Sequence, residues 1–260
     1  MIEEPDIIVS VRGLKTGYGE TVILRDINFD VRRGEVFVIL GGSGSGKSTL
    51  LKTLVGLYAP LEGEVVIAGH NQFEADDDER MVLLRKIGVL YQGGALFGSM
   101  TLLENVRLPL DELTALPEPL KELIALSRLK LVGLGEAAQK MPSELSGGMQ
   151  KRAGIARAMV LDPQILFLDE PSAGLDPVTS AGLDQLIMDL AHHFGITFVI
   201  VTHELASIYS IADRSIMLDV RTQTIIAEGK PDELRNHASE PWVRKFFNRE
   251  PETMQAAHSN

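Results

Sequence analysis

The chain contains no cysteine and one tryptophan, and Phe, Trp and Tyr together make up 5% of its residues. Without cysteine there can be no disulfide, no thiolate zinc site and no cysteine nucleophile, which is typical of a protein from a reducing compartment. Basic residues are also scarce, with 25 Lys and Arg against 36 Asp and Glu, so the formal net charge is -11. Because direct binding to nucleic acid or anionic lipid depends on Lys and Arg, this charge argues against both as direct partners.

Long hydrophobic runs are missing as well. No apolar stretch approaches the ~18 residues that a membrane-spanning helix needs, and the acidic start MIEEPD lacks the pattern of a signal peptide. The chain has 260 residues, of which 45% are hydrophobic and 23% charged, an ordinary globular balance with material for a sizeable core. We therefore expect a soluble cytoplasmic protein that reaches a membrane only through another protein.

Strand and helix patterns alternate along most of the chain. Residues 7–15 and 21–31, separated by the turn Gly17-Tyr18-Gly19, predict an antiparallel pair. The runs 35–40, 165–168 and 196–201 are continuously apolar, as in strands that are covered on both faces. Shorter strands are predicted at 63–68, 87–91, 215–218 and 224–227, and helices at 50–57, 76–86, 102–141 (with breaks at Pro109, Pro117 and Pro119), 177–193 and 231–247.

A glycine-rich loop follows the predicted strand 35–40. It matches G-x-x-x-x-G-K-S/T between a strand and a helix, the context that distinguishes a phosphate-binding loop from a chance run of glycines. Its backbone N–H groups would cradle phosphates, the Lys47 ammonium would reach the β- and γ-phosphates, and the Ser48 hydroxyl would ligate Mg²⁺. The predicted nucleotide-binding residues of this loop are Gly41, Gly42, Ser43, Gly44, Ser45, Gly46, Lys47, Ser48 and Thr49.

The stretch 145–176, LSGGMQKRAGIARAMVLDPQILFLDEPSAGLD, carries a second set of candidates. Ser146-Gly147-Gly148 opens a helical run, and a helix N-terminus with glycines favours the approach of an anion. The strand 165–168 ends in Asp169 and Glu170, at the edge where open α/β sheets hold ligands. The alternative for this stretch is an ordinary helix start and a strand whose acids cap the next helix.

These motifs occur in the order found in the ATPase subunits of ABC transporters, and the chain resembles those subunits from Ile7 to about Phe247. The elements of the resemblance are Walker A (41–49), the signature (145–150), Walker B (165–169) with Glu170, the turn 172–176, Gln92 and His203. The resemblance implies an α/β fold, a P-loop nucleotide-binding domain with a parallel core sheet and an antiparallel β subdomain. It also implies one domain over 1–250, with a helical subdomain inserted at about 93–159. Residues 251–260 are expected to be a polar, disordered tail.

The resemblance also implies roles in ATP hydrolysis with Mg²⁺. Asp169, with Ser48 and Gln92, would hold Mg²⁺, and Glu170 would be the general base. His203 would contact the γ-phosphate and orient the attacking water, and Tyr18 would stack on adenine. By itself a histidine at a strand end, or an aromatic residue in a turn, is more often structural. Ser146, Gly147 and Gly148 would bind the γ-phosphate held by a second copy, so a dimer is expected.

Within the family, the segment Gln92 to Leu110, with the GGM signature, is similar to ATPases of the Mla/Mce type. These serve transport of phospholipid or other hydrophobic substrates at the bacterial inner membrane. The similarity implies an integral membrane permease, an MCE-domain substrate-binding protein and a STAS-domain regulator. The chain would then lie on the cytoplasmic face of the inner membrane, attached through the permease.

Other functions remain open. One is the ATPase subunit of an importer for amino acids or another small polar solute. A soluble ABC ATPase acting on DNA or ribosomes is disfavoured by the acidic charge and by the short interval 50–144, which leaves no room for a long coiled coil. A nucleotide-binding module without turnover is disfavoured by the presence of both Glu170 and His203.

Each of two apolar features also has two possible interpretations. The segment Gly93 to Met100 is either core or a docking surface, because Leu96 and Phe97 stand beside glycines outside any helical period. Near the C-terminus, Trp242, Phe246 and Phe247 share one helix face. That face packs either on its own domain or on a second copy.

Overall fold

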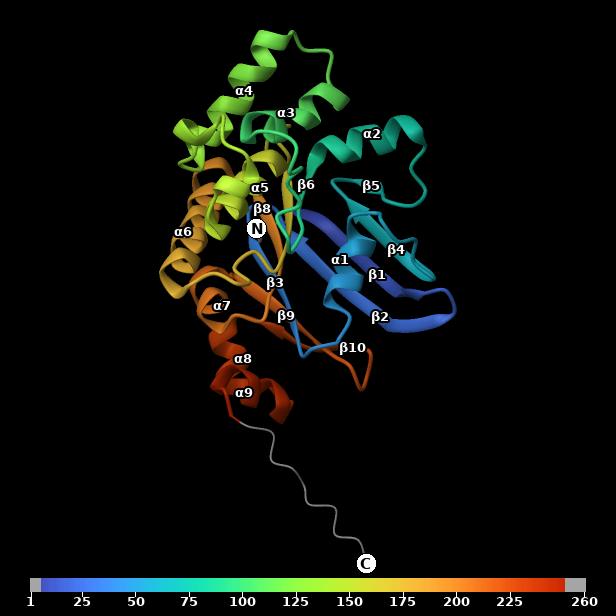
Figure 1. The fold of residues 1–260 in the computed structure, drawn as a ribbon. Coiled ribbons are helices and arrows are strands. Elements are labelled where there is room, and N and C mark those ends of the chain that lie inside the picture. Colours follow the sequence, from blue (N-terminus) through green and yellow to red (C-terminus); the bar gives the residue numbers. More distant parts are fainter. Residues whose placement is uncertain (1–5, 251–260) are drawn as a thin grey trace, which may run out of the picture.

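The computed structural model describes residues 6–250, and the predicted disordered tail 251–260 lies outside them. The described chain forms two sheets (Figure 1). A 6-stranded sheet has the order β10-β9-β3-β8-β7-β6, and a 4-stranded sheet has the order β2-β1-β4-β5. The strands are β1 (Ile7–Tyr18), β2 (Thr21–Arg32), β3 (Val36–Gly41), β4 (Glu62–Ile67), β5 (His70–Asn71), β6 (Ile87–Leu90), β7 (Ile165–Asp169), β8 (Thr197–Val201), β9 (Arg214–Asp219) and β10 (Thr224–Gly229).

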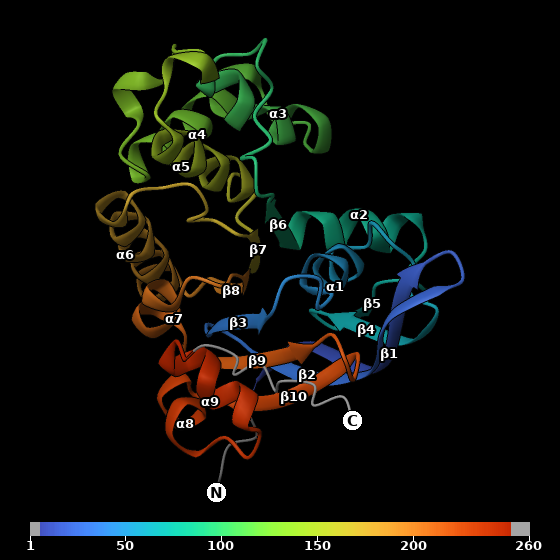
Figure 2. The ribbon, with the colours of Figure 1, turned by 60° about the horizontal axis from the view of Figure 1, so that its bottom comes forward.

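Helices connect the strands of the larger sheet. They are α1 (Lys47–Leu54), α2 (Asp77–Lys86), α3 (Leu102–Leu113), α4 (Glu118–Leu131), α5 (Gly147–Ala158), α6 (Pro177–Phe194), α7 (Leu205–Ile211), α8 (Pro231–His237) and α9 (Pro241–Asn248). Two short 3-10 turns, η1 (Gly135–Ala137) and η2 (Pro142–Glu144), lie between α4 and α5. In both views α3, α4 and α5 gather at the end of the molecule opposite α8 and α9 (Figures 1 and 2). Within residues 6–250, none of these helices has the length and apolar character to cross a membrane.

The central strands of the larger sheet are buried on both faces, as their continuous apolar runs predicted. On β3, Val36, Val38 and Leu40 face one hydrophobic cluster, while Phe37 and Ile39 face another. The first cluster takes in helices α3 to α6, and the second takes in α1 and the antiparallel sheet. Because β3, β7 and β8 each separate two cores, a polar residue fits only at their ends.

The antiparallel sheet forms as predicted, but the turn is shorter than expected. β1 continues through Gly17 and Tyr18, and Tyr18 pairs with Thr21 in β2. Only Gly19 and Glu20 remain as the hairpin loop, where Gly19 adopts φ +56°. Backbone pairing thus extends the strands to a two-residue turn, which places Tyr18 at the last position of β1.

Two helix predictions were wrong. Pro109 does not break a helix but lies inside α3, which begins with a capping box between Thr101 and Glu104 and buries an apolar stripe that includes Val106 and Leu110. This packing and the cap offset the loss of one backbone hydrogen bond at proline. Conversely, the helix predicted over 231–247 is two helices, α8 and α9, because Glu240 precedes Pro241 and is extended (φ −75°, ψ 121°).

The aromatic face of α9 packs on its own domain, the first of its two interpretations. Phe247 is buried, and Trp242 and Phe246 pack against the same hydrophobic cluster as α3 to α6. The ring of Phe247 meets Tyr209 of α7 edge-on, with centroids 5.9 Å apart. The C-terminal helix is therefore part of the core that supports the larger sheet.

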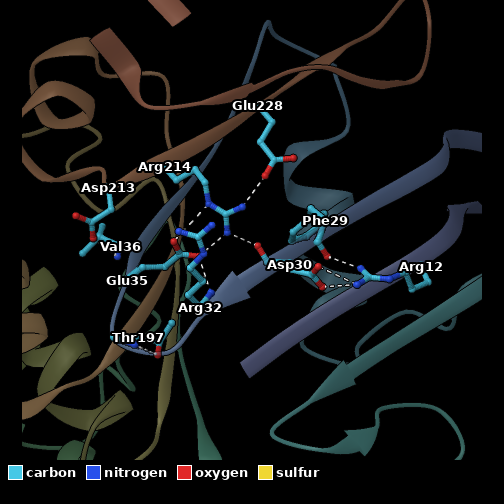
Figure 3. Close-up of polar contacts among 11 residues, drawn as sticks. Arg12, Phe29, Asp30, Arg32, Glu35, Val36, Thr197, Asp213, Arg214 and Glu228 are labelled. Carbon is cyan, nitrogen blue, oxygen red and sulfur yellow. Dashed lines mark hydrogen bonds and ion pairs between the residues drawn. The ribbon is translucent and has the colours of Figure 1, made fainter. Parts of the chain in front are cut away.

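A partly buried arginine joins the two sheets at the edge near β10 (Figure 3). Arg214, on β9, pairs with Glu35 at 2.7 Å and with Glu228 on β10 at 2.5 Å, and it also donates to the backbone carbonyl of Asp30 on β2. The oxygen of Glu35 that pairs with Arg214, Oε1, also accepts the backbone N–H of Arg32 at 2.6 Å. Glu35 is only 9% exposed, so this pair is largely removed from solvent.

Replacing Glu35 by alanine should lower the free energy of unfolding by about 3 kcal/mol, because it leaves the Arg214 guanidinium partly buried without its main counter-charge. Urea denaturation measures the change. The control is Glu62→Ala, which removes an exposed partner of Lys15 and should change stability little. Equal losses in the two variants would contradict the buried role of the Glu35 pair.

Candidate active site

The candidate site lies at one edge of the larger sheet. β3, β8 and β7 are neighbouring parallel strands, with Ile39 opposite Val201 and Asp169 opposite Val201 in the register. Their carboxyl ends therefore meet at the same edge. β3 leads into the glycine-rich loop, β7 ends in Asp169, and His203 follows β8 after a single residue. Chain segments more than 120 residues apart in sequence meet here, as in the approach of Ser48 to Asp169.

The glycine-rich loop closes directly onto a helix N-terminus. α1 begins at Lys47, three residues earlier than predicted, so Lys47 and Ser48 already belong to its first turn. Gly46 has φ +93°, and a Cβ there would lie 2.9 Å from side-chain atoms of Ile23 and Leu24. Glycine is therefore required at this position both for the backbone conformation and for the close packing.

A hollow of about 280 Å³ opens over the loop. It is lined by Tyr18, Ile23, Gly44, Ser45, Gly46, Lys47, Ser48 and Thr49. This lining has no acidic residue, and the unpaired N–H groups of a helix N-terminus face an anion favourably. The residues present therefore fit a polyphosphate.

Lys47 is held by the loop it belongs to. Its ammonium donates to the carbonyl oxygens of Gly41 at 2.9 Å and Gly42 at 3.0 Å. Burial lowers the pKa of Lys47, and the nearby charges of Glu170 and Asp169 oppose that shift. The side chain can exchange its two carbonyl partners for phosphate oxygens without leaving the loop.

Ser48 and Asp169 place two oxygen atoms side by side. The Ser48 hydroxyl lies 3.4 Å from Oδ1 of Asp169, whose residue is 7% exposed. Burial raises the pKa of Asp169, the charge of Glu170 raises it further, and the Ser48 hydrogen bond lowers it. Within residues 6–250, no cluster of three or more His, Asp or Glu forms a metal site. These oxygens fit Mg²⁺, which usually combines one or two protein ligands with phosphate oxygens and water.

Glu170 is held in an unusual conformation beside His203. Its backbone is left-handed at φ +48°, which is uncommon for a residue with a side chain and is typical of functional sites. Its N–H donates to the Val201 carbonyl at 2.8 Å. Oε1 lies 2.7 Å from Nδ1 of His203, whereas Oε2 is buried and has no hydrogen-bond partner among the described residues. One carboxylate oxygen is thus anchored, and the other can accept a proton.

Two further predicted residues lie at the border of this site. Tyr18 lines the hollow, and its hydroxyl lies 2.9 Å from the hydroxyl of Thr49. Gln92 follows β6 after one residue, and its side chain is exposed. The carbonyl of Gln92 accepts a hydrogen bond from Lys151. Tyr18 is therefore close to the glycine-rich loop through Thr49, and Gln92 is close to the carboxylates through Lys151.

The signature residues lie elsewhere on the chain. Ser146 caps α5 by accepting the Met149 N–H at 3.3 Å, and both Ser146 and Gly147 are exposed. Gly148 lies so close to α6 that an added Cβ would be 2.3 Å from Cγ2 of Thr179. In the described part of the chain, the structure brings Ser48, Asp169, Glu170 and His203 together, while Ser146 to Gly148 pack beside α6.

Two residues near the site were not predicted from the sequence. Lys151 is buried, and its ammonium donates to the carbonyl oxygens of Gln92 and Glu170. Trp242 of α9 approaches the loop, since a Cβ added at Gly42 would lie 4.0 Å from the indole Cζ2. The partners of both residues are distant in sequence, so neither leaves a local pattern. The one sequence feature that could have pointed to Lys151 is that it is a lysine within a helix rich in small residues.

Comparisons with known proteins agree on one family. The family model described as ABC transporter matches residues 24–173. The chain is 43% identical over 242 residues to the probable ribonucleotide transport ATP-binding protein mkl of Mycobacterium leprae, covering 93% of this chain and 69% of that protein. It is 40% identical over 241 residues to the intermembrane phospholipid transport system ATP-binding protein MlaF of Escherichia coli K12, covering 92% and 88% of the two chains.

Solved structures show the same fold. The dimeric ATP-binding cassette MJ0796, in a post-hydrolysis state bound to ADP and Pi, matches with a TM-score of 0.76 and 35% identity, over 86% of this chain and 98% of that one. CbiO1 from Clostridium perfringens, part of an ABC transporter complex, matches with a TM-score of 0.81 and 31% identity, over 89% and 92%. The predicted fold class is thus confirmed.

Lys47→Ala should abolish nucleotide binding, because it removes the cation that faces the phosphate hollow. Trp242 is the only tryptophan of the chain and lies near Gly42, so ATP should change its fluorescence in the wild-type protein. The variant should show no change in an ATP titration, and calorimetry should agree. Lys15→Ala, which affects an exposed pair with Glu62, is the control. Wild-type affinity in Lys47→Ala would refute the role of Lys47.

Proposed function

The chain belongs to the ABC transporter family, and we propose that it is the ATPase subunit that drives a transporter of phospholipid or another hydrophobic substrate. ATP is the nucleotide and Mg²⁺ the metal of this family's ATPase reaction. The observation that carries the catalytic part of the proposal is the Glu170 carboxylate, anchored at one oxygen by His203 and unpaired at the other.

The proposed mechanism assigns binding, orientation and proton transfer to separate groups. The loop N–H groups and Lys47 would bind the phosphates, and Ser48 and Asp169, with Gln92, would hold Mg²⁺. When bound, Mg²⁺ neutralises charge on the phosphate oxygens. Glu170 would accept the proton of the attacking water as the water oxygen bonds to the γ-phosphorus and the bond from that phosphorus to the β-phosphate oxygen breaks, releasing ADP and phosphate. His203 fixes the Glu170 carboxylate from its exposed side, where it can also reach the γ-phosphate.

We propose that turnover needs a second copy of the chain. Ser146 and Gly147 are exposed at the N-terminus of α5, where they can bind an anion. Ser146 to Gly148 are not among the residues that line the ATP hollow of their own chain. Two solved relatives are described as dimeric, which supports a dimer. Each copy would then supply Ser146 to Gly148 to its partner's ATP, while Tyr18 stacks on adenine in its own hollow.

Phe97 is the residue we propose for docking to a permease. Its ring is 51% exposed although its backbone is held firmly, since Asn105 accepts the Phe97 N–H at 2.7 Å and donates to the Phe97 carbonyl at 3.1 Å. The guanidinium of Arg157 lies 5.9 Å from the ring centroid and donates to the Ala95 carbonyl at 2.7 Å. A rigid segment that presents an exposed aromatic ring favours a docking surface over a core.

The finer assignment concerns partners and substrate. The relative named as the ATP-binding protein of an intermembrane phospholipid transport system supports a phospholipid substrate. Together with the resemblance of residues 92–110, it leads us to propose a permease, an MCE-domain protein and a STAS-domain regulator as partners, with the chain on the cytoplasmic face of the bacterial inner membrane. The relative named for ribonucleotide transport supports the polar-solute alternative. Identification of the substrate that copurifies with the chain distinguishes the phospholipid transporter from the polar-solute importer.

Glu170→Gln should retain ATP binding and lose most turnover, because removal of a general base typically costs ~10²- to 10⁴-fold in rate. Glutamine keeps the size of the side chain, so binding followed by Trp242 fluorescence should change little. ATP hydrolysis at wild-type rate in this variant would exclude Glu170 as the base. Glu136→Gln, on the exposed surface of η1, is the control for loss of one negative charge.

Phe97→Asp should stop transport while the free subunit still folds and hydrolyses ATP, because it places a charge in an apolar contact. Pull-down from membranes should recover the wild-type chain with a membrane protein and with phospholipid, identified by mass spectrometry. The variant should recover neither. Ribonucleotide in place of lipid would favour the polar-solute importer.

A matched control for Phe97 exists at the end of α6. Phe194 is 54% exposed, close to the exposure of Phe97, and it lies outside the segment 93–100. Phe194→Asp should leave assembly and transport intact. If both variants assemble and transport like the wild type, Phe97 is not a docking residue.

A further inference from the structure

Lys151 is a buried lysine that reaches two loops at once. It belongs to α5, the helix that begins with the signature residues, and it is 6% exposed. Its ammonium donates to the carbonyl oxygen of Gln92 and, at 3.3 Å, to the carbonyl oxygen of Glu170. A buried ammonium needs such partners, since desolvation disfavours its charge.

The two carbonyls belong to the segments that follow neighbouring strands. β6 and β7 are parallel, with Leu90 opposite Leu168, so the chain leaves both strands at the same edge of the sheet. Gln92 and Glu170 each stand two residues beyond these paired positions. Lys151 therefore closes a bridge between the start of the segment 93–100 and the proposed catalytic carboxylate.

Glu170 depends on this bridge for its backbone. Its N–H is held by the Val201 carbonyl of β8, and its own carbonyl accepts from Lys151 at 3.3 Å and from the backbone N–H of Ala173 at 3.2 Å. Of these bonds, the one from Lys151 is the only one made by a side chain, and the residue held by them adopts its left-handed conformation. A strained conformation persists only where the surroundings determine it fully. Without Lys151 the Glu170 carbonyl keeps only the local bond from Ala173, so Glu170 should relax and move its carboxylate.

We propose that Lys151 is a positioning residue for ATP hydrolysis, which acts through Glu170 by holding the backbone of Glu170 and Gln92 to the signature helix. The proposal rests on the proposed role of Glu170 as the general base. It also gives α5 a second task. The N-terminus of this helix would meet the ATP of the partner, while Lys151, just over one turn further on, holds the base that serves the ATP of its own chain.

This arrangement links the two ATP sites of a dimer through one rigid helix. If α5 shifts when Ser146 to Gly148 bind the partner's ATP, Lys151 shifts with it and carries the Glu170 carbonyl. The carboxylate then reaches its working position only when the second site is filled. Lys151 also ties this movement to Gln92, and so to the segment that carries Phe97.

Lys151→Met removes the charge and the donors while keeping the length of the side chain. We expect kcat to fall by ~10²-fold, the loss typical of a catalytic group displaced by about 1 Å. The KM for ATP should stay within a factor of about two, because the phosphate hollow is untouched. Lys151→Arg should restore much of kcat, since it again offers a cation with several donors. Lys140→Met, on the exposed surface, controls for loss of one positive charge.

A double variant separates positioning from a general structural role. In the Glu170→Gln background, Lys151→Met should cause little further loss of ATPase rate, because both changes disable the same group. A further ~10²-fold loss of ATPase rate in the double variant would overturn the proposal. So would a wild-type kcat in Lys151→Met, or a rise of its KM as large as its loss of kcat. If Lys151→Met does not fold, Lys151→Gln takes its place under the same criteria, since it keeps amide donors without charge.

The failure of this proposal can be told from failure of the proposed function. A wild-type ATPase rate in the Glu170→Gln single variant would exclude Glu170 as the general base, whatever the result for the Lys151 variants. Loss of turnover in Glu170→Gln, together with normal turnover in the Lys151 variants, would support Glu170 as the general base and refute only the positioning role of Lys151. All measurements use the full chain in detergent-free solution and, where it is available, the complex recovered from membranes.

Discussion

Parallel pairing of β3, β8 and β7 is the constraint on which the site depends. Hydrogen bonding in this register brings the ends of three strands to one edge, and with them the glycine-rich loop, the Asp169–Glu170 pair and His203. The strands can pair this way because both of their faces are covered by separate hydrophobic clusters. The apolar runs of the sequence thus do more than fill a core, since they place polar groups at the one edge where solvent is near.

The second constraint is electrostatic. Two adjacent carboxylates, Asp169 and Glu170, are mostly buried, and burial, followed by the charge of Glu170, raises the pKa of Asp169. Lys47 and Lys151 lie close enough to oppose the effect, although burial lowers the pKa of both ammonium groups. The site therefore holds opposite charges in a poorly solvated space, where a polyphosphate and a divalent cation would exchange partners with groups already present.

One helix connects these features to the rest of the molecule. The N-terminus of α5 is exposed, whereas Lys151 further along is buried against the site. The same helix carries Arg157, which holds the carbonyl of Ala95 beneath the exposed ring of Phe97. In the proposed dimer and complex, the partner's nucleotide, the chain's own carboxylate and the membrane partner would each meet this helix or a residue that it holds. This arrangement suits a protein that converts hydrolysis into movement of another subunit.

The sequence by itself determined the elements whose cause is local. The glycine-rich loop, the buried strands and the acids at the end of β7 follow from residues within one short segment, and so the fold class could be predicted. Tertiary structure decided what depends on distant packing. Pro109 stays inside α3 because a buried stripe and a cap outweigh one lost hydrogen bond. Lys151 meets Glu170 and Gln92 across 19 and 59 residues of chain, and Trp242 reaches the loop from the far C-terminal helix. No spacing along the chain encodes these contacts, because they exist only once the sheet has brought its strand ends together.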